Sequence, residues 1–155
     1  SKKGQGATFN IYLPASEKEA EKVVEVSEEL TKGTETVLLV DDEAIILEVS
    51  RDLLEAMGYR VFTAKSGKEA IELYREKRDD IDIVLLDMVM PHMGGGEAYD
   101  RMKEINPDIK VLLSSGFGID GQATKILDRD CNGFIQKPFN MKELSGKIRE
   151  ILDKK

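Results

Sequence analysis

The 155-residue sequence has few of the residues on which several classes of protein depend. Its one cysteine, Cys131, excludes an intramolecular disulfide and a cysteine-rich zinc site, and predicts a reducing, cytoplasmic location. Its one histidine, His92, would have to be the base of any Ser-His-Asp type of site. No apolar run approaches the roughly 20 residues of a membrane span, so no membrane contact by this chain is expected.

Positive charge is also scarce. The chain has 23 Lys and Arg residues against 30 Asp and Glu residues, which gives a formal net charge of −7. Binding of nucleic acid requires a basic face that neutralises phosphates, so we expect no nucleic-acid partner. Hydrophobic residues make up 41% of the sequence, which is enough for a packed core, and the length predicts one domain, or one domain with an appendage.

Strand and helix patterns alternate from Glu35 onward. Strands are predicted at 36–40, 59–64, 81–86, 109–113 and 133–136, and helices at 43–57, 66–78, 97–105, 122–128 and from 140 onward. In the first helix Ile45, Val49 and Leu53 recur at helical spacing. The strands are apolar without polar alternation, which is typical of strands that are buried on both faces. We therefore predict an α/β fold, a doubly wound parallel sheet of five strands with helices on both faces.

The first 34 residues have a different pattern. Residues 7–13 alternate polar and apolar side chains and stop at Pro14, which predicts a short strand. Residues 16–30 are rich in glutamate and have only a narrow apolar stripe, which predicts a helical linker. The sequence thus divides into a strand segment, 1–14, an acidic linker, 15–34, and the main domain, 35–155.

Reactive side chains follow four of the predicted strands. Asp41 and Asp42 come after the first strand, Asp87 after the third, Ser115 after the fourth and Lys137 after the fifth. Ligands of open parallel sheets bind beyond the carboxyl ends of the strands, so we expect these residues to converge there. Clustered carboxylates need a counter-charge, which Mg²⁺ with oxygen ligands would supply. Lys137 adds positive charge for a phosphoryl group.

Three motifs resemble those of the receiver domain of two-component response regulators. They are LLVDDE at 38–43, VLLDMVMP at 84–91 and GFIQKPF at 133–139. They occur in the family's order and spacing, and the resemblance covers about 35–155. It implies a flavodoxin-like sheet with strand order 2-1-3-4-5.

The resemblance also implies roles for single residues. Asp87 would be the phosphoacceptor, and Lys137 would be the family's lysine, with a cis bond to Pro138. Ser115 would be the switch hydroxyl, and Phe134 would be the switch aromatic. The implied Mg²⁺ ligands are Asp41, Asp42, Asp87 and the backbone carbonyl of Val89.

The implied phosphodonor is a phosphohistidine on a kinase or on a phosphotransfer domain. The receiver would catalyse its own phosphorylation, so whether the chain counts as an enzyme stays open.

A second resemblance lies in the first residues. KGQGATFNIYLP at 3–14 is similar to the last strand of the ATP-binding domain of a sensor histidine kinase. The order of strand, acidic linker and receiver is that of hybrid histidine kinases with a C-terminal receiver. The implied parent chain is a histidine kinase, whereas this chain alone would not bind ATP. The orphaned apolar face of Phe9, Ile11 and Leu13 makes a homodimer possible.

Two alternative functions use a similar fold. A phosphatase of the haloacid dehalogenase type also has an aspartate nucleophile and Mg²⁺, but it needs a second aspartate where Val89 stands. A flavodoxin-like cofactor binder needs a hydroxyl-rich phosphate loop after the first strand, where Asp41 and Asp42 would repel a phosphate. The three glycines at 94–96 lack the Lys-Ser/Thr of a phosphate-binding loop and are interpreted as a flexible connection.

Overall fold

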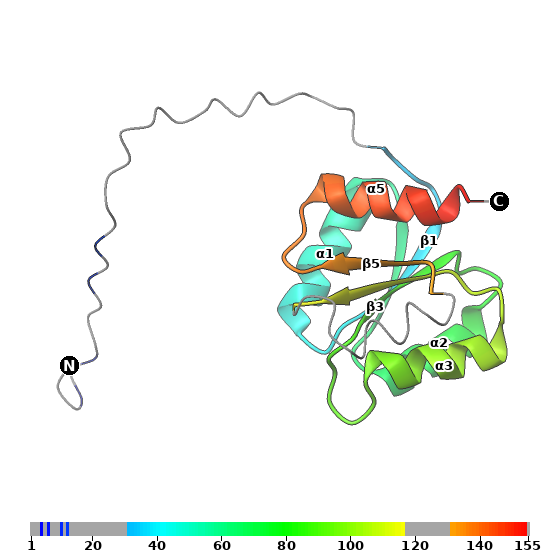
Figure 1. Cartoon of the computed structure of the whole chain (residues 1–155), viewed down its shortest axis with the longest axis horizontal. Helices are drawn as coiled ribbons and strands as arrows, with labels where there is room; N and C mark the ends of the chain where they lie inside the picture. Colours follow the sequence, from blue (N-terminus) through cyan, green and yellow to red (C-terminus); the bar gives the residue numbers. More distant parts are fainter. Residues whose placement is uncertain are drawn as a thin grey trace.

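The computed structural model describes residues 31–116 and 131–154, together with residues 4, 6, 10 and 12. These residues form a sheet of five parallel strands in the order β2-β1-β3-β4-β5, as predicted (Figure 1). The strands are β1 (Thr36–Val40), β2 (Arg60–Ala64), β3 (Ile83–Asp87), β4 (Val111–Ser115) and β5 (Gly133–Gln136). The helices are α1 (Ala44–Ala56), α2 (Gly67–Lys77), α3 (Gly95–Ile105) and α5 (Met141–Leu152).

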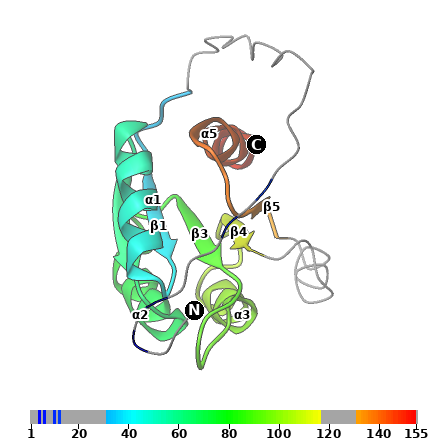
Figure 2. The ribbon, with the colours of Figure 1, turned by 90° about the vertical axis from the view of Figure 1, so that its left-hand side faces the viewer.

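The sheet separates two hydrophobic cores, one on each face. Helices α2 and α3 cover one face and α1 and α5 cover the other (Figure 2). Along β1, Leu38 and Val40 enter the α2/α3 core, whereas Val37 and Leu39 enter the α1/α5 core. Every residue of β1 is buried, which explains why its sequence is apolar without alternation.

The predicted apolar stripe of α1 does not face the sheet. Ile45 is 75% exposed and Val49 is 53% exposed, whereas Leu47 and Leu54 are buried in the core. This helix has apolar residues on more than one side, so spacing alone does not determine which side packs. With Leu47 and Leu54 in the core, one apolar side of α1 is left in contact with solvent.

The predicted flexible connection of three glycines is also wrong in part. Gly95 and Gly96 are the first two residues of α3, and Gly94 is its N-cap. The helix therefore begins two residues before the predicted start at Glu97.

The segment before β1 packs against α5. The Ser145 hydroxyl donates a hydrogen bond to the carbonyl of Thr31 (2.8 Å), and the Arg149 guanidinium contacts the Glu35 carboxylate (2.6 Å). The Gly33 amide donates to the carbonyl of Met57 (3.1 Å). These contacts extend the described fold beyond the predicted boundary at residue 35.

We expect Gly33→Ala to destabilise the fold. A Cβ at this buried glycine would lie 2.1 Å from Cε1 of Tyr59, whose ring is itself buried. Overpacking of this kind typically costs about 1–3 kcal/mol. Gly146→Ala in α5 is the matched control, because a Cβ there has nothing within 4 Å and alanine favours a helix. Urea unfolding checks both variants, and unchanged stability of Gly33→Ala would show that the segment contributes nothing.

Several predicted elements fall outside the described residues. They are the strand at 7–13 with Phe9, Ile11 and Leu13, the helical linker at 16–30 and the helix at 122–128. Within 31–116 and 131–154, no helix is long and apolar enough to cross a membrane.

Candidate functional site

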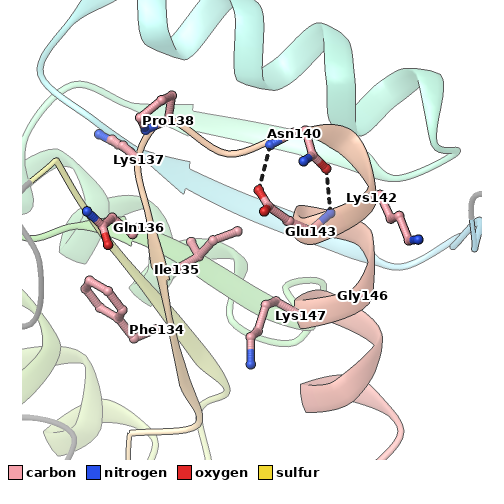
Figure 3. A pocket seen from close by; sticks show the side chains of 10 residues that line it. All are labelled: Phe134, Ile135, Gln136, Lys137, Pro138, Asn140, Lys142, Glu143, Gly146 and Lys147. Carbon is pink, nitrogen blue, oxygen red and sulfur yellow. Dashed lines mark hydrogen bonds between the residues drawn. The ribbon is translucent and has the colours of Figure 1, made fainter. Parts of the chain in front are cut away.

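The reactive side chains gather at the carboxyl edge of the sheet. Asp41 directly follows β1, and its amide is bonded to the end of β2 at the carbonyl of Ala64 (3.1 Å). Asp87 is the last residue of β3 and pairs with Ser114 in β4. Lys137 follows β5, at the turn into α5 (Figure 3). Parallel pairing of β1, β3, β4 and β5 therefore brings residues that are up to 96 positions apart in sequence to one edge.

Lys137 joins the two buried carboxylates of this edge. Its Nζ lies 2.5 Å from Oδ2 of Asp41 and 2.6 Å from Oδ1 of Asp87. Asp41 is 2% exposed and Asp87 is 5% exposed. One ammonium thus neutralises one of two carboxylates, and the cluster keeps a net negative charge that favours a cation.

Backbone amides hold the other oxygen of each carboxylate. The Glu43 amide donates to Oδ1 of Asp41 (2.9 Å), and the Val89 amide donates to Oδ2 of Asp87 (2.9 Å). Each carboxylate is therefore fixed at both oxygens. Sequence patterns could not identify these donors, because every residue other than proline carries the same N–H.

The site perturbs the pKa values of two of its groups. Burial raises the pKa of the Asp87 carboxyl, and the hydrogen bond and charge of Lys137 offset this only in part. Burial by itself would lower the pKa of Lys137, but the hydrogen bonds with Asp41 and Asp87 outweigh burial and raise it. Lys137 therefore stays charged.

The other predicted site residues surround this cluster at different depths. Ser115 is buried at the end of β4, and its carbonyl accepts from the Lys137 amide (2.8 Å). Phe134 is half-buried and packs against the α2/α3 core. Asp42 is exposed, and Val89 is 58% exposed in the loop after β3. The Lys137–Pro138 bond is cis, as the resemblance implies.

The donor atoms suit a hard cation such as Mg²⁺. Asp41 and Asp87 offer carboxylate oxygens, which Mg²⁺ prefers as ligands. Asp42 is exposed to solvent, so water molecules, several of which Mg²⁺ usually retains, can reach this side of the site. Among the described residues, no three acidic, histidine or cysteine side chains already form a metal-binding group. The Lys137 ammonium lies on one oxygen of each of the two carboxylates, Oδ2 of Asp41 and Oδ1 of Asp87.

Comparison with known proteins establishes the family. Residues 37–149, more than half of the chain, match the response regulator receiver domain. The chain belongs to this family and is a receiver of two-component signal transduction. Receivers of this kind depend in general on Mg²⁺ and work with phosphodonor kinases or phosphotransfer partners. The comparisons give no support to the phosphatase alternative.

Individual relatives agree with this assignment. The chain is 38% identical over 168 aligned residues to the sensor kinase CckA of Brucella abortus, in an alignment that covers 99% of this chain but 17% of that kinase. A receiver domain from Clostridium thermocellum superposes with a TM-score of 0.74 at 30% identity, covering 77% of this chain and 94% of that one. CheY in the CheX-CheY-BeF3-Mg complex of Borrelia burgdorferi has a TM-score of 0.73 at 26% identity, covering 77% and 90%.

Proposed function

We propose that this receiver accepts a phosphoryl group on Asp87 from a phosphohistidine, with Mg²⁺ bound at the same edge of the sheet. The observation that carries the proposal is the buried Asp87 carboxylate, which lies 2.6 Å from the Lys137 ammonium and 2.9 Å from the Val89 amide. A carboxylate held between fixed positive and dipolar groups is preorganised to bind additional negative charge.

In the transfer, a carboxylate oxygen of Asp87 attacks phosphorus in line with the leaving imidazole nitrogen. The P–N bond breaks with its electron pair on nitrogen, and the new P–O bond makes an acyl phosphate. Lys137 moves from the carboxylate to the phosphoryl oxygens and neutralises part of their charge. When bound by Asp41, Asp42, Asp87 and the Val89 carbonyl, Mg²⁺ would supply further charge neutralisation.

The phosphoryl oxygens then change the positions of the two switch residues, Ser115 and Phe134. Ser115 is the hydroxyl that we assign to bind one of them, and Phe134 is the ring that repacks. Two features support this assignment: Ser115 is buried and its carbonyl accepts from the Lys137 amide, and Phe134 is only half-buried, with its ring on the side of β5 away from α5 (Figure 3). A half-buried ring can change its position without opening a void in a closely packed core.

The exposed apolar side of α1 is suited to the phosphodonor. Val49 and Leu53 line a groove of about 500 Å³ with Pro138 and Phe139 of the β5–α5 turn, and Lys137 lines it as well. A helix packed there would bury apolar side chains and hold its histidine near Asp87. We therefore propose a helical phosphohistidine partner at this groove.

Val49→Ser is expected to separate this partner from small donors. Transfer from an autophosphorylated kinase that phosphorylates the wild type should slow about tenfold, the effect of losing roughly 1.4 kcal/mol of contact. Phosphorylation by a small acyl phosphate should stay unchanged, because Val49 lies outside the acid cluster. Glu72→Ser on the opposite face, in α2, is the control. Equal slowing with both donors would contradict docking at α1.

The chain is also proposed to be a part of a longer protein. The match to CckA extends over nearly the whole chain but spans 17% of that kinase, which supports a hybrid histidine kinase as the parent. On this proposal, residues 1–14 are the last strand of the ATP-binding domain and 15–34 are the linker. A homodimer through the apolar strand and a cytoplasmic location stay predictions.

Intact-mass spectrometry tests the proposed function. The protein is incubated with a small acyl-phosphate donor in Mg²⁺ and, as a control, in excess chelator. We expect one phosphoryl group per chain in Mg²⁺, removable by hydroxylamine, and far less in chelator. No mass gain in Mg²⁺, or a gain that hydroxylamine leaves in place, would overturn it.

Val89 is expected to slow loss of the phosphoryl group. Its side chain is 58% exposed two residues after Asp87, and a valine cannot orient a water by hydrogen bonding. Val89→Asn or Val89→Glu should speed hydrolysis about tenfold, the effect of one positioning interaction of roughly 1.4 kcal/mol. The second residue predicted to border this approach, Phe117, lies outside the described residues. A time course of phosphoryl loss in Mg²⁺ checks the prediction; unchanged half-lives would exclude a gating role for Val89.

A further inference from the structure

We propose that Gly95, the first residue of α3, is a positioning residue that holds Asp87 in its reactive orientation. The inference rests on the proposed role of Asp87. A Cβ at Gly95 would lie 2.2 Å from the carbonyl oxygen of Asp87, 3.0 Å from its carbonyl carbon and 2.9 Å from Cα of Met88. All three are backbone atoms, so no side chain can rotate away to admit the methyl group.

Met88, the residue after Asp87, is held by hydrogen bonds on both of its peptide groups. The Met88 amide donates to the carbonyl of Ser114 in β4 (2.9 Å), and the Met88 carbonyl accepts from the Gly95 amide (3.1 Å). Met88 leads directly to Val89, whose amide donates to Oδ2 of Asp87 (2.9 Å). The start of α3 therefore fixes the turn that orients the carboxylate, while Oδ1 remains directed at Lys137.

Glycine is required at position 95 because of this close contact, and not because of its backbone conformation or its helix propensity. Gly95 is outside the left-handed region, where only Gly58 and two N-terminal glycines are found among the described glycines. In a helix, alanine is ordinarily favoured over glycine. Local propensity thus predicts that Gly95→Ala is tolerated, and only the close approach to Asp87 opposes it.

Gly94 provides a matched control one residue earlier. It is the N-cap of α3 with φ −69°, and a Cβ there would meet only the Met88 carbonyl oxygen, at 3.5 Å. This is an ordinary van der Waals contact. Gly94→Ala adds the same methyl group to the same connection without pressing on the Asp87 peptide.

In Gly95→Ala, the new methyl group clashes with the carbonyl of Asp87. To relieve this clash, α3 must move away from the Asp87–Met88 peptide. The Gly95–Met88 hydrogen bond then lengthens, and the Val89 amide moves relative to Oδ2 of Asp87. A displacement on the order of 1 Å in a reacting group can cost about 100-fold in rate. The loss should appear in the maximal rate, because the donor's own contacts at the edge of the sheet are unchanged.

The experiment measures phosphoryl gain by intact mass over a range of acyl-phosphate concentrations in Mg²⁺. We expect Gly95→Ala to lower the maximal rate about 10- to 100-fold, while the donor concentration for half-maximal rate changes by less than about threefold. Gly94→Ala should match the wild type. In ¹⁵N spectra without donor, the Val89 amide resonance should shift in Gly95→Ala and not in Gly94→Ala, which a role in general stability would not produce.

A stabilised variant distinguishes a loss of phosphorylation from a loss of the folded structure. Gly95→Ala is also made together with Gly146→Ala, and the double variant is compared with Gly146→Ala alone. A folded variant with a wild-type maximal rate or an unmoved Val89 resonance overturns the proposal. Failure of the double variant to fold overturns it as well, because Gly95 would then serve the whole fold. Failure of the proposed function is distinct, since the wild type itself would then gain no phosphoryl group.

Discussion

Asp87→Asn is expected to gain no phosphoryl group under conditions in which the wild type gains one. A neutral amide lacks the charge that makes the carboxylate a nucleophile. The fold should survive, because the remaining carbonyl oxygen can still accept from Val89 and Lys137 keeps its contact with Asp41. Intact mass gives the result, with Asp79→Asn on the exposed surface as control. Retained labelling would move the acceptor to another residue, such as Asp42.

This variant also has an expected pH dependence. The pKa of Asp87 is raised in the folded protein, mainly by burial, so its contribution to stability is full below the unfolded pKa of about 3.9. That contribution is lost as pH rises through the folded pKa. Because asparagine does not titrate, Asp87→Asn should gain stability relative to the wild type across this window. Urea unfolding at a series of pH values checks the sign.

Lys137→Met is expected to have the second large effect. Without the ammonium, the buried carboxylates of Asp41 and Asp87 repel each other and have no positively charged partner. Removing one partner of a buried pair costs about 3–5 kcal/mol. Loss of a preorganised charge at the reacting group should also slow phosphorylation about 10²- to 10³-fold.

The pH dependence follows from both titrating groups. The pKa of Lys137 is raised in the folded protein, so its stabilisation is full below the unfolded value of about 10.4 and is lost above the folded pKa. The deficit of Lys137→Met should therefore be large at neutral pH and smaller in acid, where protonation of Asp87 relieves the repulsion.

Metal addition gives an independent check on Lys137→Met. Mg²⁺ should stabilise the variant more than the wild type, because it replaces the missing positive charge. Lys147→Met in α5 is the control, since Lys147 is paired with Glu150 at the surface. Unfolding with and without Mg²⁺ measures the effect. Wild-type stability and rate in Lys137→Met would contradict the account of the site.

The sequence predicts the sheet because its central strands, β1, β3 and β4, are buried on both faces. The continuous apolar runs of β1 and β3 identify them as buried strands. Parallel pairing then places the reactive residues at the strand ends at one edge of the sheet. The sequence therefore predicts that Asp41, Asp87 and Lys137 converge at one edge of the sheet. Their convergence is confirmed.

Features that depend on helix rotation or on close approach were not predictable. Ile45 and Val49 have the spacing of a buried stripe, yet the rotation of α1 leaves them exposed. The sequence favours a flexible connection at Gly95, because it does not reveal that a Cβ there would lie 2.2 Å from the carbonyl oxygen of Asp87. The hydrogen bonds from the amides of Glu43 and Val89 are not predictable either, because every residue other than proline carries the same N–H.

The measurement that tests the central claim most directly is identification of the phosphorylated residue in the wild type. The protein is phosphorylated in Mg²⁺, treated with borohydride, which reduces an acyl phosphate to the alcohol, then digested and sequenced by tandem mass spectrometry. The account predicts that position 87, and no other, is converted from aspartate to homoserine. Conversion at Asp41 or Asp42, or a stable phosphate on Ser115 with Asp87 intact, would contradict it.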